Sequence, residues 1–228
     1  MATTIIYKGA QIATVADNTT KTIKTASKWV EGNIGVQNAA PATKFDDLVQ
    51  RTLSGAYQCN GATQIAPYAC YSMSQLTSVY FPNATSVGMG AFYSCSRLQS
   101  VNMPEVTTLN TNGTMFRYCS ALTTLNMPKV SNIPNQAFTN CSALTSISFP
   151  NLTTISTYAF QSCSKLESVY LYGSTVVTLA NANAFASTPL SRSNYLGRWG
   201  SIFVPTSLLN TYKAAANWSR YTARFVGV

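Results

Sequence analysis

The stretch that decides the fold is AFYSCSRLQSVNMP, residues 91–104. It returns as MFRYCSALTTLNMP at residues 115–128, as AFTNCSALTSISFP at residues 137–150, and again from Ala159 to Leu171. A degraded copy precedes these from Cys70 to Pro82, and a partial copy ends the series at residues 184–190. Self-similarity of this kind indicates a repeat protein built from stacked units.

A leucine shared by all copies sets the period of the repeat. The intervals between successive leucines are 22, 24, 22, 22 and 24 residues, for Leu76, Leu98, Leu122, Leu144, Leu166 and Leu190. This period falls within the range of leucine-rich repeats, in which each coil has one short strand and one return segment. The two longer intervals predict insertions in return loops.

Within each copy the pattern Leu-x-x-Val/Ile/Leu-x-Phe/Met-Pro alternates apolar and polar residues, which predicts a strand with one buried face. Leu98, Val101 and Met103 are expected to point inward, and Ser100 and Asn102 outward. The proline ends the strand because it has no N–H for a ladder hydrogen bond. A shorter apolar element is expected next, ending at Val87, Leu109, Ile133, Ile155 and Leu179.

Two further repeat positions predict ladders of stacked core side chains. The phenylalanines are Phe92, Phe116, Phe138, Phe160 and Phe185, and the cysteines are Cys95, Cys119, Cys141 and Cys163. A metal or redox array is the alternative for the cysteines, but parallel stacked side chains do not converge tetrahedrally, and free cysteine packs as a small hydrophobe. Cys59 and Cys70 lie outside that ladder. A disulfide between them remains open, with reduced thiols as the default in a chain that shows no export signal.

The motif Ala-Phe-x-x-Cys-Ser-x-Leu-x-Ser-Val-x-Phe-Pro-x-x-Thr-x-Ile resembles the BspA-type leucine-rich repeat, a family of bacterial surface proteins and of proteins from gut bacteria and their phages. The resemblance covers roughly half the chain. It implies a β-rich leucine-rich-repeat solenoid of about six coils of 22–24 residues, with a small N-terminal β module and helical caps. Function does not follow from this, because fold and function are separable.

The ends of a solenoid need caps. Residues 44–53 place Phe45, Leu48, Val49 and Leu53 on one helical face, so residues 44–67 are expected to form the N-terminal cap and a first partial coil. Repeats occupy residues 68–190 and the C-terminal cap residues 191–228. In this cap, residues 202–205 read as a last strand, and a helix follows over about 206–216 with Leu208, Leu209 and Tyr212 inward. The string VPTSLLNTYKAAANW is similar to the cap often found after these repeats.

Residues 1–38 do not repeat, and the linker 39–43 separates them from the cap. Short strands are expected at residues 3–7, 11–15, 20–24 and 33–36, joined by Gly and Asn turns. The phrases IIYKGAQIATV, TKTIKTASK and NIGV resemble small β modules of tail and baseplate-associated proteins in prophages of Gram-positive gut bacteria. That resemblance implies an anchoring or assembly role for residues 1–38.

The residue inventory argues against an enzyme. The chain has no histidine, which removes Ser-His-Asp and Cys-His pairs and the commonest zinc ligand. Its six carboxylates include one adjacent pair, Asp46 and Asp47, and Glu105 and Glu167 occupy different repeat positions, unlike a glycosidase pair. No phosphate-binding or dinucleotide motif is present. We therefore expect no catalytic, cofactor or metal site.

The candidate binding face is the outward row of the strands, which offers hydroxyls and amides with an aromatic residue at each end: Ser78, Tyr80, Ser100, Asn102, Thr124, Asn126, Ser146, Ser148, Ser168 and Tyr170. Such a face suits a host-surface protein or glycan. The alternative is that these are ordinary solvent-facing strand residues without a ligand.

The net charge of +9 is concentrated in residues 191–228, which carry five basic and no acidic side chains. Arg192, Arg198, Lys213, Arg220 and Arg224 are spread out rather than clustered on one face, so we expect a solvated end or subunit contact and no nucleic-acid site. There is neither a signal-peptide pattern nor an apolar run of membrane-spanning length. The sequence therefore predicts a protein made in the cytoplasm, without membrane insertion.

Two functional hypotheses follow. The first is a non-enzymatic structural or receptor-binding component of a phage tail or phage-like particle. Its partners would be other particle subunits, through residues 1–38 and the basic end, a host-surface protein or glycan, and further copies of itself. The second is a bacterial surface adhesin or interaction module, which would require export.

Overall fold

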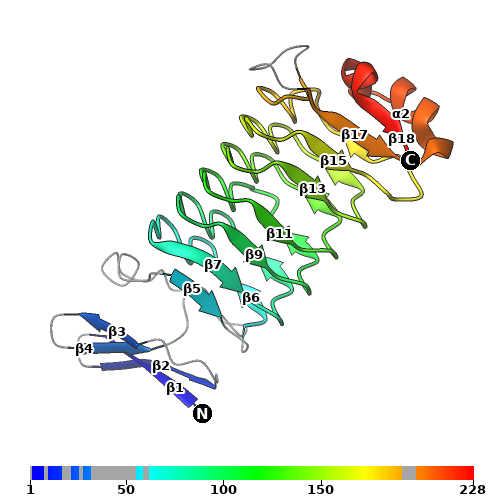
Figure 1. Ribbon diagram of the computed structural model, residues 1–228. Coiled ribbons are helices and arrows are strands. Elements are labelled where there is room, and N and C mark those ends of the chain that lie inside the picture. Colours follow the sequence, from blue (N-terminus) through cyan, green and yellow to red (C-terminus); the bar gives the residue numbers. More distant parts are fainter. Residues whose placement is uncertain are drawn as a thin grey trace.

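The computed structural model describes residues 2–7, 10–16, 22–25, 28–31, 55–58, 62–191 and 199–228 of the chain. Figure 1 shows the part from β5 to β18 as coils stacked along one axis, each passing from a strand into a return segment. One continuous hydrophobic core runs through these coils, from Tyr57 to Tyr221. The predicted leucine-rich-repeat solenoid is confirmed.

One row of parallel strands is formed by the alternating segments of the repeat. Leu98, Val101 and Met103 are fully buried, as predicted, and Ser100 and Asn102 flank Val101 on the outer face, because successive strand residues point to opposite faces. The row consists of β5 (Gly55–Gln58), β7 (Leu76–Tyr80), β9 (Ser100–Asn102), β11 (Thr124–Asn126), β13 (Ser146–Ser148), β15 (Ser168–Tyr170), β17 (Ser201–Val204) and β18 (Phe225–Gly227).

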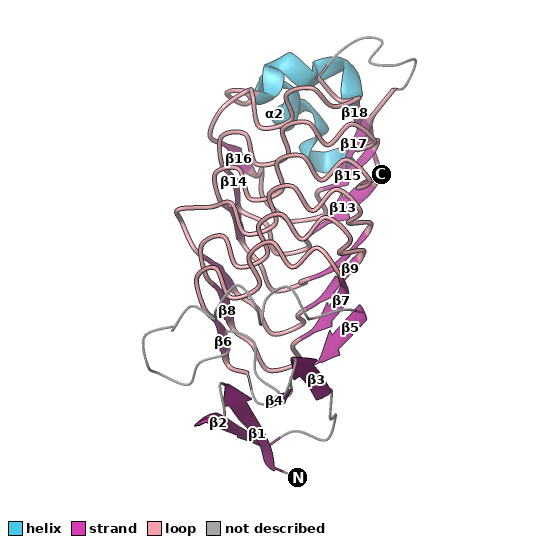
Figure 2. Cartoon of the chain, turned by 90° about the vertical axis from the view of Figure 1, so that its left-hand side faces the viewer, coloured by secondary structure: helices cyan, strands magenta, loops and turns pink. Residues whose placement is uncertain are grey.

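A second row of two-residue strands forms the return side of each coil. Figure 2 shows the two rows along opposite edges of the solenoid. The second residue of each return strand is buried, and from β8 on it is the predicted apolar position. These strands are β6 (Gln64–Ile65), β8 (Ser86–Val87), β10 (Thr108–Leu109), β12 (Asn132–Ile133), β14 (Thr154–Ile155) and β16 (Thr178–Leu179).

The two insertions lie outside the strands, as expected. The first follows β10, where a Cβ at Gly113 would collide with the carbonyl oxygen of Asn135. Gly113 also has a φ of +73°, which glycine adopts without steric cost. The second lies between β15 and β16.

The Phe-x-x-Cys turns form a third ladder of backbone hydrogen bonds between coils. In each, the phenylalanine N–H and the N–H two residues later donate to the next coil, as from Phe92 to the Met115 oxygen at 2.8 Å and from Ser94 to the Arg117 oxygen at 2.8 Å. The predicted phenylalanine ladder lies directly beneath and is confirmed. Its five rings are fully buried and stack at centroid distances of 5.3, 5.2, 5.3 and 5.4 Å.

Each of these turns contains left-handed residues at recurring positions. The residue two positions after the phenylalanine has a positive φ in every full copy, as in Ser94 at 59° and Asn140 at 63°. A second left-handed residue lies four positions before the first one, as in Gly90 at 59° and Thr114 at 62°. Left-handed backbone costs an L-residue about 1–2 kcal/mol, so the turn ladder and the buried rings hold these residues in place.

Both strand rows are interrupted at the same level of the stack. Among the described strands, no pairing joins β11 to β13 or β10 to β12. The turn ladder continues across this gap, because the N–H groups of Phe116 and Tyr118 donate to the Ala137 and Thr139 oxygens at 2.9 Å each. The solenoid therefore consists of two strand-paired halves joined through the turns and the core.

The C-terminal cap covers the open edge of the last return strand. Asn217 and Trp218 donate side-chain N–H groups to the oxygens of Leu179 and Val177 at 2.8 and 2.7 Å, and the Val177 N–H donates to the Tyr212 hydroxyl at 3.0 Å. Side chains of the cap thus replace the missing next coil.

The cap contains the 3₁₀ turns η1 (Thr206–Leu208) and η2 (Trp218–Arg224) and the short helix α2 (Leu209–Ala214). The predicted helix over about 206–216 corresponds to η1 followed directly by α2, so its first turn is 3₁₀ and it ends at Ala214. Tyr212 is fully buried, and Leu208 and Leu209 pack partly against the core. No helix in the described ranges is long and apolar enough to cross a membrane.

Near the N-terminus, four strands form an antiparallel sheet in the order β2-β1-β4-β3. Its strands are β1 (Ala2–Tyr7), β2 (Ala10–Ala16), β3 (Thr22–Thr25) and β4 (Lys28–Glu31). The first two match prediction, the third begins later than expected, and β4 was not predicted. The expected strand at 33–36, the linker 39–43 and the cap helix 44–53 lie outside the described residues.

Candidate functional site

The ten residues predicted to form a binding face all lie in the first strand row. Every one is at least partly exposed, and Thr124, Asn126, Ser146 and Ser148 are the most open of them. Their strands are three to five residues long, and each flanks a central core residue. We call these ten residues the strand face.

The parallel register places equivalent residues of the strand face side by side. Ser78 is opposite Ser100, which is opposite Thr124, and Tyr80, Asn102 and Asn126 form the neighbouring column. Beyond the gap between the two halves, Ser146 is opposite Ser168 and Ser148 opposite Tyr170. The predicted single row is thus two registered patches.

Hydrogen bonding fixes part of this face. The Asn126 Nδ2 donates to the Asn102 Oδ1 at 2.8 Å, so the two amides form a short ladder between β9 and β11. Each amide keeps further donor and acceptor capacity. The row therefore offers oriented polar groups to a partner.

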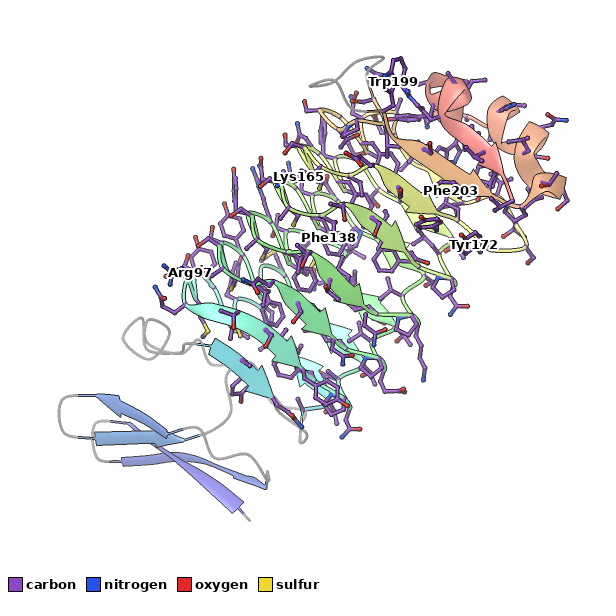
Figure 3. All side chains as sticks on the ribbon, viewed as in Figure 1. Arg97, Phe138, Lys165, Tyr172, Trp199 and Phe203 are labelled. Carbon is purple, nitrogen blue, oxygen red and sulfur yellow. The ribbon has the colours of Figure 1, made fainter. Side chains whose placement is uncertain are left out.

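An aromatic cluster ends the strand face near the C-terminal cap. Tyr170 stacks on Phe203 at 4.8 Å between centroids and lies 5.6 Å from Tyr172, whose side chain is 52% exposed. Figure 3 shows Tyr172 and Phe203 together at the ends of the last strands. The sequence reasoning missed both residues. Tyr170 pairs with Phe203 of β17. This strand lies in the cap, beyond the last copy of the repeat, so the repeat period does not predict where it begins.

The strand face carries no charged side chain. The nearest described ion pair lies just beyond the strands, where Lys129 Nζ is 2.6 Å from Glu105 Oε2, with both side chains nearly half exposed. An exposed pair of this kind contributes at most about 1 kcal/mol. Recognition at the strand face would thus rest on hydrogen bonds and aromatic contact.

The predicted basic end is only partly solvated. Arg192 and Arg198 lie outside the described residues. Arg224 is buried, with its guanidinium 4.5 Å from the centre of the Trp199 ring, and Arg220 donates to the Asn183 side chain at 3.2 Å. Arg224 is thus not one of the solvated residues of the expected solvated end or subunit contact, because its stem and head group pack into the cap.

The cysteine ladder is confirmed as a packing feature. Cys95, Cys119, Cys141 and Cys163 are free, fully buried thiols. Each donates to the carbonyl at the phenylalanine position one coil earlier, as from Cys119 Sγ to the Phe92 oxygen at 3.1 Å. Burial raises the pKa of Cys95 and of Cys163 to about 12 and raises that of Cys119 and Cys141 well above the ordinary thiol value. These thiols are protonated and inert at neutral pH.

Cys70 takes the phenylalanine position of the degraded first copy, and its carbonyl oxygen accepts a hydrogen bond from the Cys95 thiol at 2.9 Å. It is free and fully buried, and its expected alternative partner Cys59 lies outside the described residues. Within the described part of the chain, no three His, Cys, Asp or Glu side chains gather in a way that would hold a metal ion.

Comparisons with known proteins agree on the repeat. The model of the BspA type leucine rich repeat region matches residues 63–194 in six copies. No curated protein matches the sequence significantly. Among solved structures, a leucine-rich repeat protein from Bacteroides ovatus is 20% identical with a TM-score of 0.56, over 76% of this chain and 42% of that one.

A leucine-rich repeat protein from Eubacterium ventriosum is 18% identical with a TM-score of 0.53, over 80% of this chain and 55% of that one. The leucine-rich repeat protein of T. pallidum is 21% identical with a TM-score of 0.48, over 51% of this chain and 58% of that one. The chain thus spans about half the length of these structures, and its likeness to the B. ovatus and E. ventriosum proteins concerns the fold. Because the family model covers more than half of the sequence, the chain belongs to the BspA-type leucine-rich repeat family.

Proposed function

We propose that this protein is a non-enzymatic recognition subunit that binds a protein or glycan of a cell surface through its strand face. The observation that carries the proposal is the two registered patches of neutral hydroxyl, amide and aromatic side chains. Except at β11 and β13, which border the gap, these strands are hydrogen-bonded on both sides, so little conformational entropy is lost on binding.

The size of the row constrains the partner. From β5 to β17 it comprises seven strands, so at about 4.8 Å per strand it is about 30 Å long. Three-residue strands make it only about 10 Å wide. A stable interface covers about 800 Å² of each partner, so the partner would also need to cover an edge of the row. The exposed Tyr172 beside Tyr170 and Phe203 supplies an aromatic anchor there.

The setting we propose is a phage tail or phage-like particle, with residues 1–38 attaching the protein to other subunits. Support comes from the resemblance of the N-terminal phrases to tail-associated modules. The antiparallel order of β1 to β4 also differs from the parallel rows of the solenoid, as expected of a module with a separate task. A bacterial surface adhesin with the same strand face is the second candidate, and membership of the BspA-type family is consistent with it.

Purified particles from a strain that encodes the protein test the setting. Mass spectrometry should find the chain at a fixed ratio to tail subunits, and immunogold electron microscopy should place it on the tail. Its absence from every particle fraction, with the chain recovered from the cell surface, would refute the particle role and support the adhesin. Turnover in a broad hydrolase screen would contradict the non-enzymatic assignment.

A further inference from the structure

A second candidate surface lies on the turns that precede β9, β11 and β13. A groove of about 600 Å³ runs across three coils there. It is lined by uncharged polar side chains, which are Ser94, Ser96, Tyr118, Ser120, Asn140 and Ser142. None of them belongs to the strand face, so the groove does not depend on the function proposed above.

The backbone makes this groove a fixed feature. Ser94, Tyr118 and Asn140 are left-handed, with φ of 59°, 64° and 63°. Their N–H groups donate to the Arg117, Thr139 and Gln161 oxygens of the next coil at 2.8, 2.9 and 2.9 Å. Equivalent side chains therefore repeat at the spacing of the coils, about 4.8 Å, and a ligand need not order them.

The lining offers many hydrogen-bonding groups. Ser120 Oγ donates to the Ser96 oxygen at 3.3 Å, and Ser142 Oγ donates to the Ser120 oxygen at 3.3 Å. Each of these hydroxyls keeps lone pairs that can accept a bond. The side chains of Ser94 and Asn140 have no hydrogen-bond partner within the described structure, so both can donate and accept.

Aromatic rings lead along the coils into the groove. Tyr71 stacks on Tyr93 at 5.1 Å, and Tyr93 meets Tyr118 edge to face at 5.5 Å. Tyr118 is 38% exposed, and the Arg117 guanidinium donates to its hydroxyl at 3.2 Å and to the Gln136 Oε1 at 2.9 Å. The ring is thereby held in place beside the serine hydroxyls.

This chemistry selects among ligand classes. An apolar peptide anchor would find no aliphatic side chain in the lining, and a nucleic acid would need a row of cations. Figure 3 shows Arg97 and Lys165 well apart along this edge, and neither lines the groove. Arg117 is a single cation beside Tyr118, and its guanidinium is bonded to Tyr118 and Gln136. An aromatic ring beside rows of hydroxyl and amide groups matches a sugar ring, which has apolar C–H faces and hydroxyl edges.

We propose that this groove binds a neutral oligosaccharide that lies along the solenoid axis. One sugar ring packs against Tyr118, and successive hydroxyls bond to the serine rows and to Asn140. The protein then carries two independent binding surfaces, the strand face and the turn groove.

The test is an array of neutral and acidic oligosaccharides probed with the full chain, followed by calorimetry with the neutral oligosaccharide of highest signal. Tyr118→Asn keeps a residue that tolerates the left-handed backbone, as Asn140 does at the equivalent position. We expect it to weaken binding about tenfold, equivalent to about 1.4 kcal/mol. Ser120→Leu fills the groove and should weaken binding at least as much.

Ser164→Leu is the matched control, because Ser164 occupies the position of Ser120 two coils further on and does not line the groove. It should bind the oligosaccharide like the unmodified chain. The proposal is overturned if no neutral oligosaccharide binds, if only acidic ones bind, or if binding is lost equally in Ser164→Leu. Loss in Tyr172→Ala alone would overturn it too and assign the sugar to the strand face.

Discussion

Replacing Phe138 with alanine should separate the solenoid into two unfolding units, whereas the same change at Phe160 should not. Both rings are fully buried, and both stack on two neighbours, at 5.2 and 5.3 Å for Phe138 and at 5.3 and 5.4 Å for Phe160. They differ in what else joins the chain on either side of them. Strand pairs flank Phe160 on both sides, but among the described strands none joins β5 to β11 with β12 to β18, and the Phe116–Phe138 stack crosses that division.

The magnitude follows from burial and stacking. Truncating a buried phenylalanine to alanine lowers the free energy of unfolding by about 3–5 kcal/mol. Each lost aromatic pair accounts for about 0.5–1.5 kcal/mol of that loss. A domain of this size is stable by only about 5–15 kcal/mol. Stability in a repeat protein is approximately a sum of coil and nearest-neighbour interface contributions. Phe138→Ala therefore weakens the one interface that already lacks strand pairs among the described coils.

Hydrogen exchange measured by mass spectrometry across a urea series resolves the two halves. In Phe138→Ala, peptides from residues 62–131 and 132–191 should lose protection at different urea concentrations. In Phe160→Ala, the midpoint should fall by a similar amount, but both halves should lose protection together. A single shared transition in both variants would refute the inference that the strand gap is the weakest interface.

Three further changes test other parts of the structure. Burial raises the pKa of Cys163 from 9.0 to about 12, so this thiol stays protonated in the fold while it ionises in the unfolded chain. The free energy of unfolding should therefore fall as the pH rises from about 9 to 12, and it should fall less in Cys163→Ala, as followed by urea titration at each pH. Thr114→Gly should raise the free energy of unfolding by about 0.5–1 kcal/mol, because φ is 62° at this β-branched residue. Gly90→Ala should lower it, because the new Cβ would lie 2.6 Å from the Tyr68 ring; thermal melts in which both variants shift in the same direction would contradict the left-handed assignment. Tyr212→Phe should cost about 1–3 kcal/mol in denaturant titrations, because the buried N–H of Val177 loses its acceptor, and an unchanged midpoint would show that the cap does not depend on this bond.

Positions that recur in every coil could be predicted from the sequence. Leu98, Phe116 and Cys141 each pack against the equivalent residues of the coils above and below. An apolar residue that recurs at one repeat position therefore predicts a buried side chain there. The strand face followed from the same alternation. The interruption between β11 and β13 could not be predicted, because Leu125 fits the repeat pattern as well as Val101 does and is nonetheless only partly buried.

Features set by non-repeating contacts were missed. Ser94, Tyr118 and Asn140 share a left-handed backbone but no residue type, since the turn ladder rather than side-chain propensity imposes it. The sequence did contain a signal for the groove. A serine follows each cysteine of the repeat, and the residue just before that cysteine is also polar in each of these coils. Trp218 and Tyr221 are fully buried in the cap, where no period identifies a core position.

Binding of the fluorescently labelled chain to a panel of Gram-positive gut bacteria, measured by flow cytometry, tests the recognition role of the strand face most directly. Asn126→Arg places a cation at the exposed centre of the strand face, and Thr108→Arg places the same charge on the exposed return row. We expect Asn126→Arg to abolish binding to the cells that the unmodified chain labels, and Thr108→Arg to leave it intact. Equal binding by the two variants would contradict recognition through the strand face.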